Sequence, residues 1–302
     1  MQVIRGVLQL VDGPPVDMPA GAIVSNGWGT IGSVEIRGAP GPKAWPKRLE
    51  IKWFSYSENR FYAIDTPLPP EALGAALSTG YSNPRNGAAG EFNIVLLGLA
   101  PGGTVSLWLA GDGIVRRVGR WQGAPVDGRW SDILDDDRTP RDQFVRDVMT
   151  RRTTSDAMLR LAKEGAPVDA WIQADERVPM QLSVVGVPTV RFAWYHAING
   201  EHEYLDTAQV WLTNSPLRAA PDGLEVGWQA ANGQRRRAVL QLDEAETRAA
   251  LDQLRKDSGT SNYQVVVDLA VTSATGATPE VSMRSARLRI ALQKVTAKIT
   301  GG

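Results

Sequence analysis

Alternating apolar and polar residues predict strands in the first half of the chain. Leu49, Ile51 and Trp53 alternate with Glu50 and Lys52, which is the period of a strand with one buried face. The same reasoning and continuous apolar runs predict further strands at Val3–Leu10, Ser33–Arg37, Arg60–Ile64, Phe92–Leu99, Thr104–Ala110 and Gly113–Trp121. Short turn signals separate them, and Pro101-Gly102 favours a type II turn. This half is therefore expected to be a meander of antiparallel strands.

The sequence also predicts four helices. A short helix is predicted at Pro69–Leu77, because proline fits the first helical turn. Two amphipathic helices are predicted in the middle, from the cap residue Thr139 to Met149 and from Ser155 to a stop at Gly165. A fourth helix is predicted at Asp243–Leu254.

The second half returns to strand patterns. The dipeptide Asn232-Gly233 is a strong hairpin signal, since both residues tolerate positive φ. The predicted strands are Val190–Tyr195, Ala208–Leu212, Leu224–Trp228, Arg237–Leu242, Gln264–Ala270 and Ala286–Leu292.

An internal repeat relates the two halves. Leu49–Trp53 matches Leu224–Trp228, and Phe92-Asn-Ile-Val resembles Tyr263-Gln-Val-Val after a small deletion. Continued without a gap, the first match pairs Arg60 with Arg235, Ala63 with Ala238, Ile64 with Val239, Glu71 with Glu246, and Ala75 with Ala250. Each half thus runs from hairpin to helix to a long apolar strand, which suggests a duplication.

These patterns predict an α+β protein with two related β-rich domains, each an antiparallel sheet with a packed helix. The domains are expected at 1–127 and 176–302, the second as a duplication of the first. A helical connector is expected at 128–175.

Composition narrows the classes of partner and chemistry. The 302 residues include no cysteine, which excludes disulfides, thiol catalysis and cysteine-based metal sites. Lysine plus arginine and aspartate plus glutamate number 33 each. Because nucleic-acid binding needs a basic surplus, we expect no nucleic-acid partner.

Candidate catalytic and metal-binding motifs are few. The two histidines, His196 and His202, lie close in sequence with Glu201 and Glu203. They suit either a metal site or the two sides of a hairpin whose turn is Asn199-Gly200. Metalloprotease, nucleophile-elbow, Walker A and dinucleotide motifs are absent from the sequence. We therefore expect no catalytic residues, no metal and no cofactor.

Eight of the ten tryptophans fall into two groups. Those within strand patterns are expected in the core, and they are Trp53, Trp108, Trp194, Trp211 and Trp228. Trp28, Trp45 and Trp130 lie in loop sequences and are candidates for a contact surface, either with a protein or with sugar rings.

Two segments resemble a known family. They are Trp45-Pro-Lys-Arg-Leu-Glu-Ile-Lys-Trp-Phe-Ser-Tyr-Ser-Glu-Asn-Arg-Phe-Tyr and Leu97-Gly-Leu-Ala-Pro-Gly-Gly-Thr-Val-Ser-Leu-Trp-Leu-Ala-Gly. Together they resemble the domain of unknown function 2931 family of Gram-negative bacterial proteins, over about residues 40–125 and loosely elsewhere. The resemblance implies a lipoprotein, and some members resemble immunity proteins of type VI secretion effectors. It brings no catalytic residues.

Localisation stays open at this point. The family pattern includes a signal and an acylated cysteine, which this sequence lacks, and no apolar run approaches the roughly 18 residues of a membrane helix. The resemblance implies a periplasmic protein, held at the membrane only by a lipid anchor that this chain does not carry. A cytoplasmic protein is the alternative.

We therefore expect a non-catalytic binding protein, an immunity protein that blocks a secreted toxin or effector, with a lipase as one candidate. The expected contacts are at the two hairpins, through Trp45, Tyr56, Glu58, Arg60, Arg235 and Arg236. A carbohydrate-binding module and an enzyme whose site assembles only on folding are the alternatives.

Overall fold

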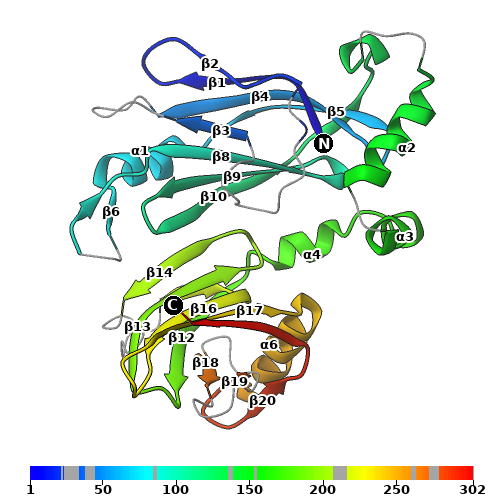
Figure 1. The fold of residues 1–302 in the computed structure, drawn as a ribbon. Coiled ribbons are helices and arrows are strands. Elements are labelled where there is room, and N and C mark those ends of the chain that lie inside the picture. Colours follow the sequence, from blue (N-terminus) through cyan, green and yellow to red (C-terminus); the bar gives the residue numbers. More distant parts are fainter. Residues whose placement is uncertain are drawn as a thin grey trace. The chain divides into compact units, whose positions relative to one another are not determined.

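A computed structural model describes residues 1–21, 23, 34–37, 45–83, 87–134, 139–152, 155–206, 216–259, 263–271 and 279–301. The chain folds into two compact units (Figure 1). The first comprises residues 1–82 and 89–171, and the second comprises 83–88 and 172–302. Strands predominate in both and nearly all pair antiparallel, with a few helices. The structure is therefore α+β and rich in β-structure, as predicted. No helix in the described part of the chain is long and apolar enough to cross a membrane.

The first unit begins with a five-stranded antiparallel sheet. Its strands lie in the order β11 (Ala124–Val126), β5 (Arg60–Pro67), β4 (Pro46–Ser55), β1 (Gln2–Leu10) and β2 (Val16–Asp17). A second antiparallel layer contains β3 (Val34–Arg37), β8 (Ile94–Ala100), β9 (Thr104–Gly111) and β10 (Ile114–Gln122). Buried Trp53 from one layer and Leu107 from the other share one hydrophobic core. Because β4 alternates as predicted, Leu49, Ile51 and Trp53 face this core.

Helices cover parts of the first unit. Helix α1 (Pro70–Thr79) follows β5 and inserts Leu73 into the core between the layers. Strands β6 (Tyr81–Ser82) and β7 (Ala89–Gly90) form a small hairpin after it. A short 3-10 turn (Trp130–Asp132) is followed by α2 (Arg141–Arg152), α3 (Ser155–Glu164) and α4 (Val168–Gln173). Gly165, at φ +75°, ends α3 as predicted.

The segment predicted as a connector, 128–175, contains helices α2, α3 and α4, and α2 is packed onto the first unit. Val145 and Val148 of α2 are buried against Phe54, Tyr56 and Phe61 of the β4–β5 hairpin. The compact first unit accordingly extends to Trp171.

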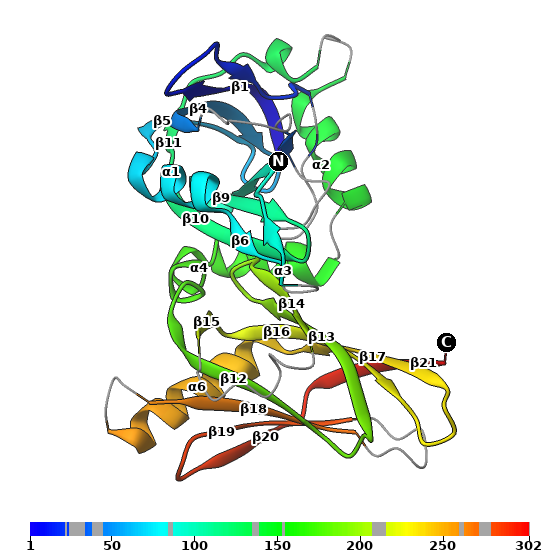
Figure 2. The same cartoon turned by 90° about the vertical axis from the view of Figure 1, so that its left-hand side faces the viewer.

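The second unit also has two layers around one core (Figure 2). One layer has the strand order β14 (His202–Asp206), β13 (Thr189–Ala197), β16 (Pro221–Gln229), β17 (Arg235–Leu242) and β21 (Val295–Gly301). The other has the order β15 (Leu217–Ala219), β12 (Arg177–Val185), β18 (Val265–Ala270), β19 (Glu280–Arg284) and β20 (Arg289–Leu292). Helix α6 (Glu244–Ser258) follows β17, with Asp243 as its N-cap. The predicted strand Ala208–Leu212 lies outside the described residues.

The two units share their order of strands. The series β2-β1-β4-β5-β11 in the first corresponds to β14-β13-β16-β17-β21 in the second. In each, a helix follows the central hairpin, and β8-β9-β10 correspond to β18-β19-β20. Trp53 and Trp228 occupy matching buried positions. This correspondence supports the predicted duplication, which stays a prediction.

The gap-free match of the repeat is wrong beyond the first strand of each hairpin. Between the matching pairs Phe54–Phe61 and Gln229–Arg235, the first hairpin has six residues (55–60) and the second has five (230–234). Trp53 pairs with Tyr62 and the matching Trp228 pairs with Arg236, so after the turn Tyr62 corresponds to Arg236 rather than to Arg237. The predicted pair Ala75 and Ala250 also differs, since the first is exposed and the second buried.

Candidate functional site

The residues that resemble the family meet at one end of the β4–β5 hairpin. Oε2 of Glu58 accepts a hydrogen bond from Ser55 Oγ at 2.7 Å. Its Oε1 accepts from the Tyr62 hydroxyl at 2.8 Å and from the backbone N–H of Gly102 at 2.9 Å. A single carboxylate therefore joins the hairpin turn to the turn between β8 and β9.

Two glycines allow the turn between β8 and β9 to come within hydrogen-bonding distance of Glu58. Gly102 has φ 75° and ψ 10°, the third-residue geometry of the type II turn that the sequence predicts. Gly103 has φ +78°, and a Cβ there would lie 2.6 Å from the carbonyl oxygen of Gly123. Any larger residue at Gly103 would displace the turn from Glu58.

Tyr56 lies inside this end of the unit and not on its surface. It is 3% exposed, and its hydroxyl donates a hydrogen bond to Gln2 Oε1. Burial raises the pKa of Tyr56 to about 12. The predicted contact through Tyr56 is corrected on this ground. Half-buried Glu58 makes three hydrogen bonds within the fold, and its predicted contact stays a prediction.

Arg141, the first residue of α2, holds the hairpin turn from the other side. Its guanidinium carbon lies 5.3 Å from the ring centroid of Phe54 and 5.5 Å from those of Phe61 and Trp130. It also donates two hydrogen bonds of 2.7 Å to Asn59, one to the side chain and one to the backbone carbonyl. Asn59 has φ +50°, and these contacts hold it in that conformation. The loop residue Trp130 is thus part of an internal aromatic cluster.

A cleft of about 690 Å³ opens beside this turn, and we call it the hairpin cleft. Arg60 is exposed at the hairpin, Val126 of the edge strand β11 is 37% exposed, and Arg141 is fixed as described. The lining residues are Asn59, Arg60, Phe61, Pro125, Val126, Asp127, Gly128 and Arg141. The cleft combines apolar surface with two guanidinium groups and one carboxylate, Asp127.

The other predicted contact residues lie apart from this cleft. Trp45 packs against the core beneath α1, where a Cβ on Gly74 would lie 3.2 Å from its ring. In the second hairpin Arg235 is exposed and Arg236 half-buried, whereas Arg237 pairs with Glu225 at 2.6 Å. The loop residue Trp28 lies outside the described residues.

The two histidines face each other across a hairpin, as one of the two predicted alternatives requires. His196 in β13 pairs with His202 in β14, and their ring centroids are 5.5 Å apart. Glu201 accepts a hydrogen bond from Arg177 at 2.6 Å, and Glu203 pairs with Arg218 at 3.1 Å. Arginines thus occupy the carboxylates that a metal would require, and the described residues contain no cluster of three metal-ligating side chains.

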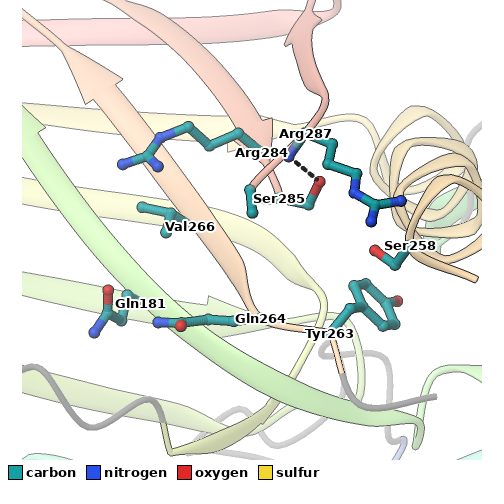
Figure 3. Close-up of a pocket in the computed structure, with 9 residues that line it drawn as sticks. Gln181, Ser258, Tyr263, Gln264, Val266, Arg284, Ser285 and Arg287 are labelled. Carbon is teal, nitrogen blue, oxygen red and sulfur yellow. Dashed lines mark hydrogen bonds between the residues drawn. The ribbon is translucent and has the colours of Figure 1, made fainter. Parts of the chain in front are cut away.

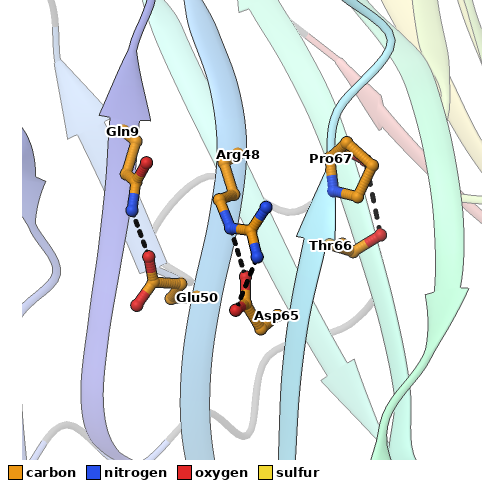
Figure 4. Close-up of polar contacts among 6 residues, drawn as sticks. All are labelled: Gln9, Arg48, Glu50, Asp65, Thr66 and Pro67. Carbon is orange, nitrogen blue, oxygen red and sulfur yellow. Dashed lines mark hydrogen bonds and ion pairs between the residues drawn. The ribbon is translucent and has the colours of Figure 1, made fainter.

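The sheet β2-β1-β4-β5-β11 of the first unit and the corresponding sheet β14-β13-β16-β17-β21 of the second carry different residues on the face that points away from the core. In the first unit this face carries polar ladders, with Gln9 bonded to Glu50 and Arg48 bonded to Asp65 at 2.5 and 2.7 Å (Figure 4). In the second unit the corresponding face carries Phe192, Trp194 and His196 on β13, with Tyr204 beside them on β14. The rings of Phe192 and Tyr204 are stacked, with centroids 5.8 Å apart. The sequence placed Trp194 in the core, whereas it lies half-buried on this face.

The fold is thus that of a β-rich α+β protein whose described surface includes the hairpin cleft and an aromatic sheet face. A family model described as a protein of unknown function (DUF2931) matches residues 3–169. The chain belongs to this family, as the resemblance predicted, and the match spans nearly the whole first unit. No curated protein and no solved structure matches the chain.

The Glu58 cluster gives a first prediction. Glu58→Ala leaves the Gly102 N–H and the Tyr62 hydroxyl without their acceptor, and we expect it to lower the free energy of unfolding by about 2–3 kcal/mol. Urea denaturation measures the change. Glu164→Ala, at an exposed position in the same unit, is the control. An equal loss in the two variants would contradict the role of Glu58.

A second prediction concerns acid stability. Burial lowers the pKa of His202 from 6.5 to about 4, with a further contribution from His196. Between these values the unfolded chain takes up a proton that the folded chain does not. The stabilisation is therefore complete above pH 6.5 and lost as the pH falls toward 4, by about 2 kcal/mol after allowance for solvent screening.

Urea denaturation at a series of pH values across this window measures the effect. His202→Gln removes the His202 contribution, so its free energy of unfolding is expected to vary less with pH. His196→Gln keeps His202 and serves as the comparison. A pH dependence in the His202 variant as steep as in the native sequence would refute the assignment.

Proposed function

We propose that this chain is a non-catalytic binding protein that blocks a secreted antibacterial effector, as an immunity protein of type VI secretion. The site of action would be the periplasm, with membrane attachment through a lipid anchor. Membership of the DUF2931 family supports the proposal, because the family resemblance implies such proteins. The observation that carries it is the hairpin cleft, a preformed concavity with an exposed arginine beside a fixed one.

The rigid side of the cleft would reduce the cost of binding. Arg141 is held by three aromatic rings and by Asn59, so its side chain has little rotamer freedom left to lose. Ordering a long side chain at an interface costs about 0.5–1.5 kcal/mol. A partner that meets Arg141 would avoid much of this cost.

The chemistry of the cleft selects the partner's contact residues. Exposed Arg60 suits a carboxylate of the partner, and Pro125 with Val126 suits an apolar side chain next to it. Arginine and aromatic anchors usually dominate protein interfaces of about 1,600 Å². The partner would therefore insert a segment that combines an acidic and an apolar residue. Arg235 and Arg236 of the second hairpin are proposed as additional contacts.

Carbohydrate binding is a second candidate, favoured by the aromatic face of the second unit. Phe192, Trp194 and Tyr204 lie on one side of the β13–β14 hairpin. Aromatic faces of this kind stack against sugar rings. A shift of tryptophan fluorescence with cell-wall glycans, absent in Trp194→Ala, would support this candidate.

A third prediction tests the leading proposal. The chain and the effector encoded beside its gene are co-expressed, and their affinity is measured with purified proteins. Arg60→Glu is expected to weaken binding by at least about 30-fold, equivalent to about 2 kcal/mol, because it opposes the partner's carboxylate. It should also abolish the rescue of poisoned cells.

Arg160→Glu, an exposed charge reversal on α3, is the matched control and should bind normally. Charge reversal at Arg235 tests the second hairpin separately. If the native chain neither binds the effector nor rescues the cells, the immunity function is refuted. If Arg60→Glu binds like the native chain, the hairpin cleft is not the contact.

A further inference from the structure

A second cleft, of about 600 Å³, lies on the outer face of β12, β18 and β19 in the second unit (Figure 3). Strand alternation creates its floor. Val265 and Val267 of β18 point into the core and are fully buried, so Val266 between them points outward into the cleft. We call it the arginine cleft. The sequence gives little sign of it, because β12 and β18 pair in parallel although they are far apart along the chain.

The walls of the arginine cleft are basic and polar. Arg284 and Arg287 belong to β19 and to the turn that follows it, and their guanidinium groups extend in opposite directions (Figure 3). Gln181 and Gln264 lie toward one end, and Tyr263 with Ser258 toward the other (Figure 3). None of the described residues that line the cleft is acidic. The cleft therefore offers hydrogen-bond donors and positive charge.

Arg284 is held in place by the buried carboxylate of Asp268, which lies beside the cleft on the same face of the sheet. Its Nε lies 2.6 Å from Asp268 Oδ2, and the side chain of Asp268 is only 8% exposed. Arg289 contacts the same oxygen at 2.8 Å but does not line the cleft. One carboxylate thus balances only one of the two guanidinium groups that contact it. The geometry also prevents Arg284 from reorienting freely.

Arg287 stands at the opposite end, near the C-terminus of α6. Its guanidinium extends toward Ser258, the last residue of that helix, and toward Tyr263 (Figure 3). The C-terminal end of a helix carries a partial charge of about −0.5. A full guanidinium charge exceeds this, so the end near Arg287 is also positive. Within the described residues its guanidinium makes no ion pair.

We infer that the arginine cleft binds a small molecule with two anionic groups, one at Arg284 and the other at Arg287. The groups are carboxylates or phosphates, which arginine binds with charge-assisted hydrogen bonds. The amides of Gln181 and Gln264 would bind polar atoms between them, above Val266. A volume of about 600 Å³ is within the usual range of small-molecule sites. This inference does not depend on the immunity function.

Calorimetric titration of the full chain tests the site. Citrate represents carboxylates and pyrophosphate represents phosphates, and sodium chloride at matched ionic strength is the control for screening. Arg284→Gln and Arg287→Gln are each expected to weaken binding about tenfold or more. Arg289→Gln is the matched control, because Arg289 shares Asp268 with Arg284 but lies outside the cleft, and it should change affinity less than twofold.

Each outcome decides the question. Binding of citrate alone or of pyrophosphate alone supports the site and identifies its chemistry. Absence of binding by both at millimolar concentration and low salt overturns it. An equal loss in Arg289→Gln would also overturn it, since the attraction would then come from the general charge of the face. If Arg284→Gln proves unstable, Arg287→Gln decides alone, because the Arg287 guanidinium has no ion pair to lose among the described residues.

Discussion

The Glu58 carboxylate is the constraint on which the described part of the first unit most depends. Its two oxygens accept hydrogen bonds from Ser55, Tyr62 and Gly102, so it fixes the β4–β5 hairpin to the β8–β9 turn of the other layer. Half-buried carboxylates without such partners are costly. Because Glu58 fixes the turn of the β4–β5 hairpin, Asn59 in that turn can accept hydrogen bonds from Arg141, and α2 can pack on the hairpin. The hairpin cleft results from this sequence of contacts.

The second unit keeps the strand order but changes the surface. Glu50 and Glu225 occupy corresponding positions on the outer face of the first sheet, and they bond to Gln9 and Arg237 respectively. Gly223 and Gly227 lie two residues before and after Glu225, on the same face of the strand. A Cβ on Gly227 would lie 2.1 Å from the ring of Phe192. Glycine thus allows aromatic rings to lie flat on the sheet. Two units with the same strand order can therefore present different chemistry on the same face of the sheet.

Local patterns predicted the parts of the structure that depend on neighbours in sequence. The alternation at Leu49–Trp53, the turn glycine Gly102 and the hairpin at Asn199-Gly200 all have local causes, and the structure confirms them. The burial of Tyr56 and the contact of Arg284 with Asp268 depend on residues distant in sequence. Tyr56 lies in a turn sequence, and turn residues are usually exposed. Its partner Gln2 is brought to it by the pairing of β1 with β4, which no local pattern reveals.

The two clefts share one physical design although they lie in different units. Each has one arginine that the fold immobilises, Arg141 by aromatic rings and Arg284 by Asp268. Each also has a second arginine, Arg60 or Arg287, on a turn or strand end beside the first. A fixed guanidinium supplies direction at little entropic cost, and a mobile one adapts to the ligand. In both proposals, binding by such a pair requires neither a nucleophile nor a metal, because the position and charge of the guanidinium groups select the anionic partner.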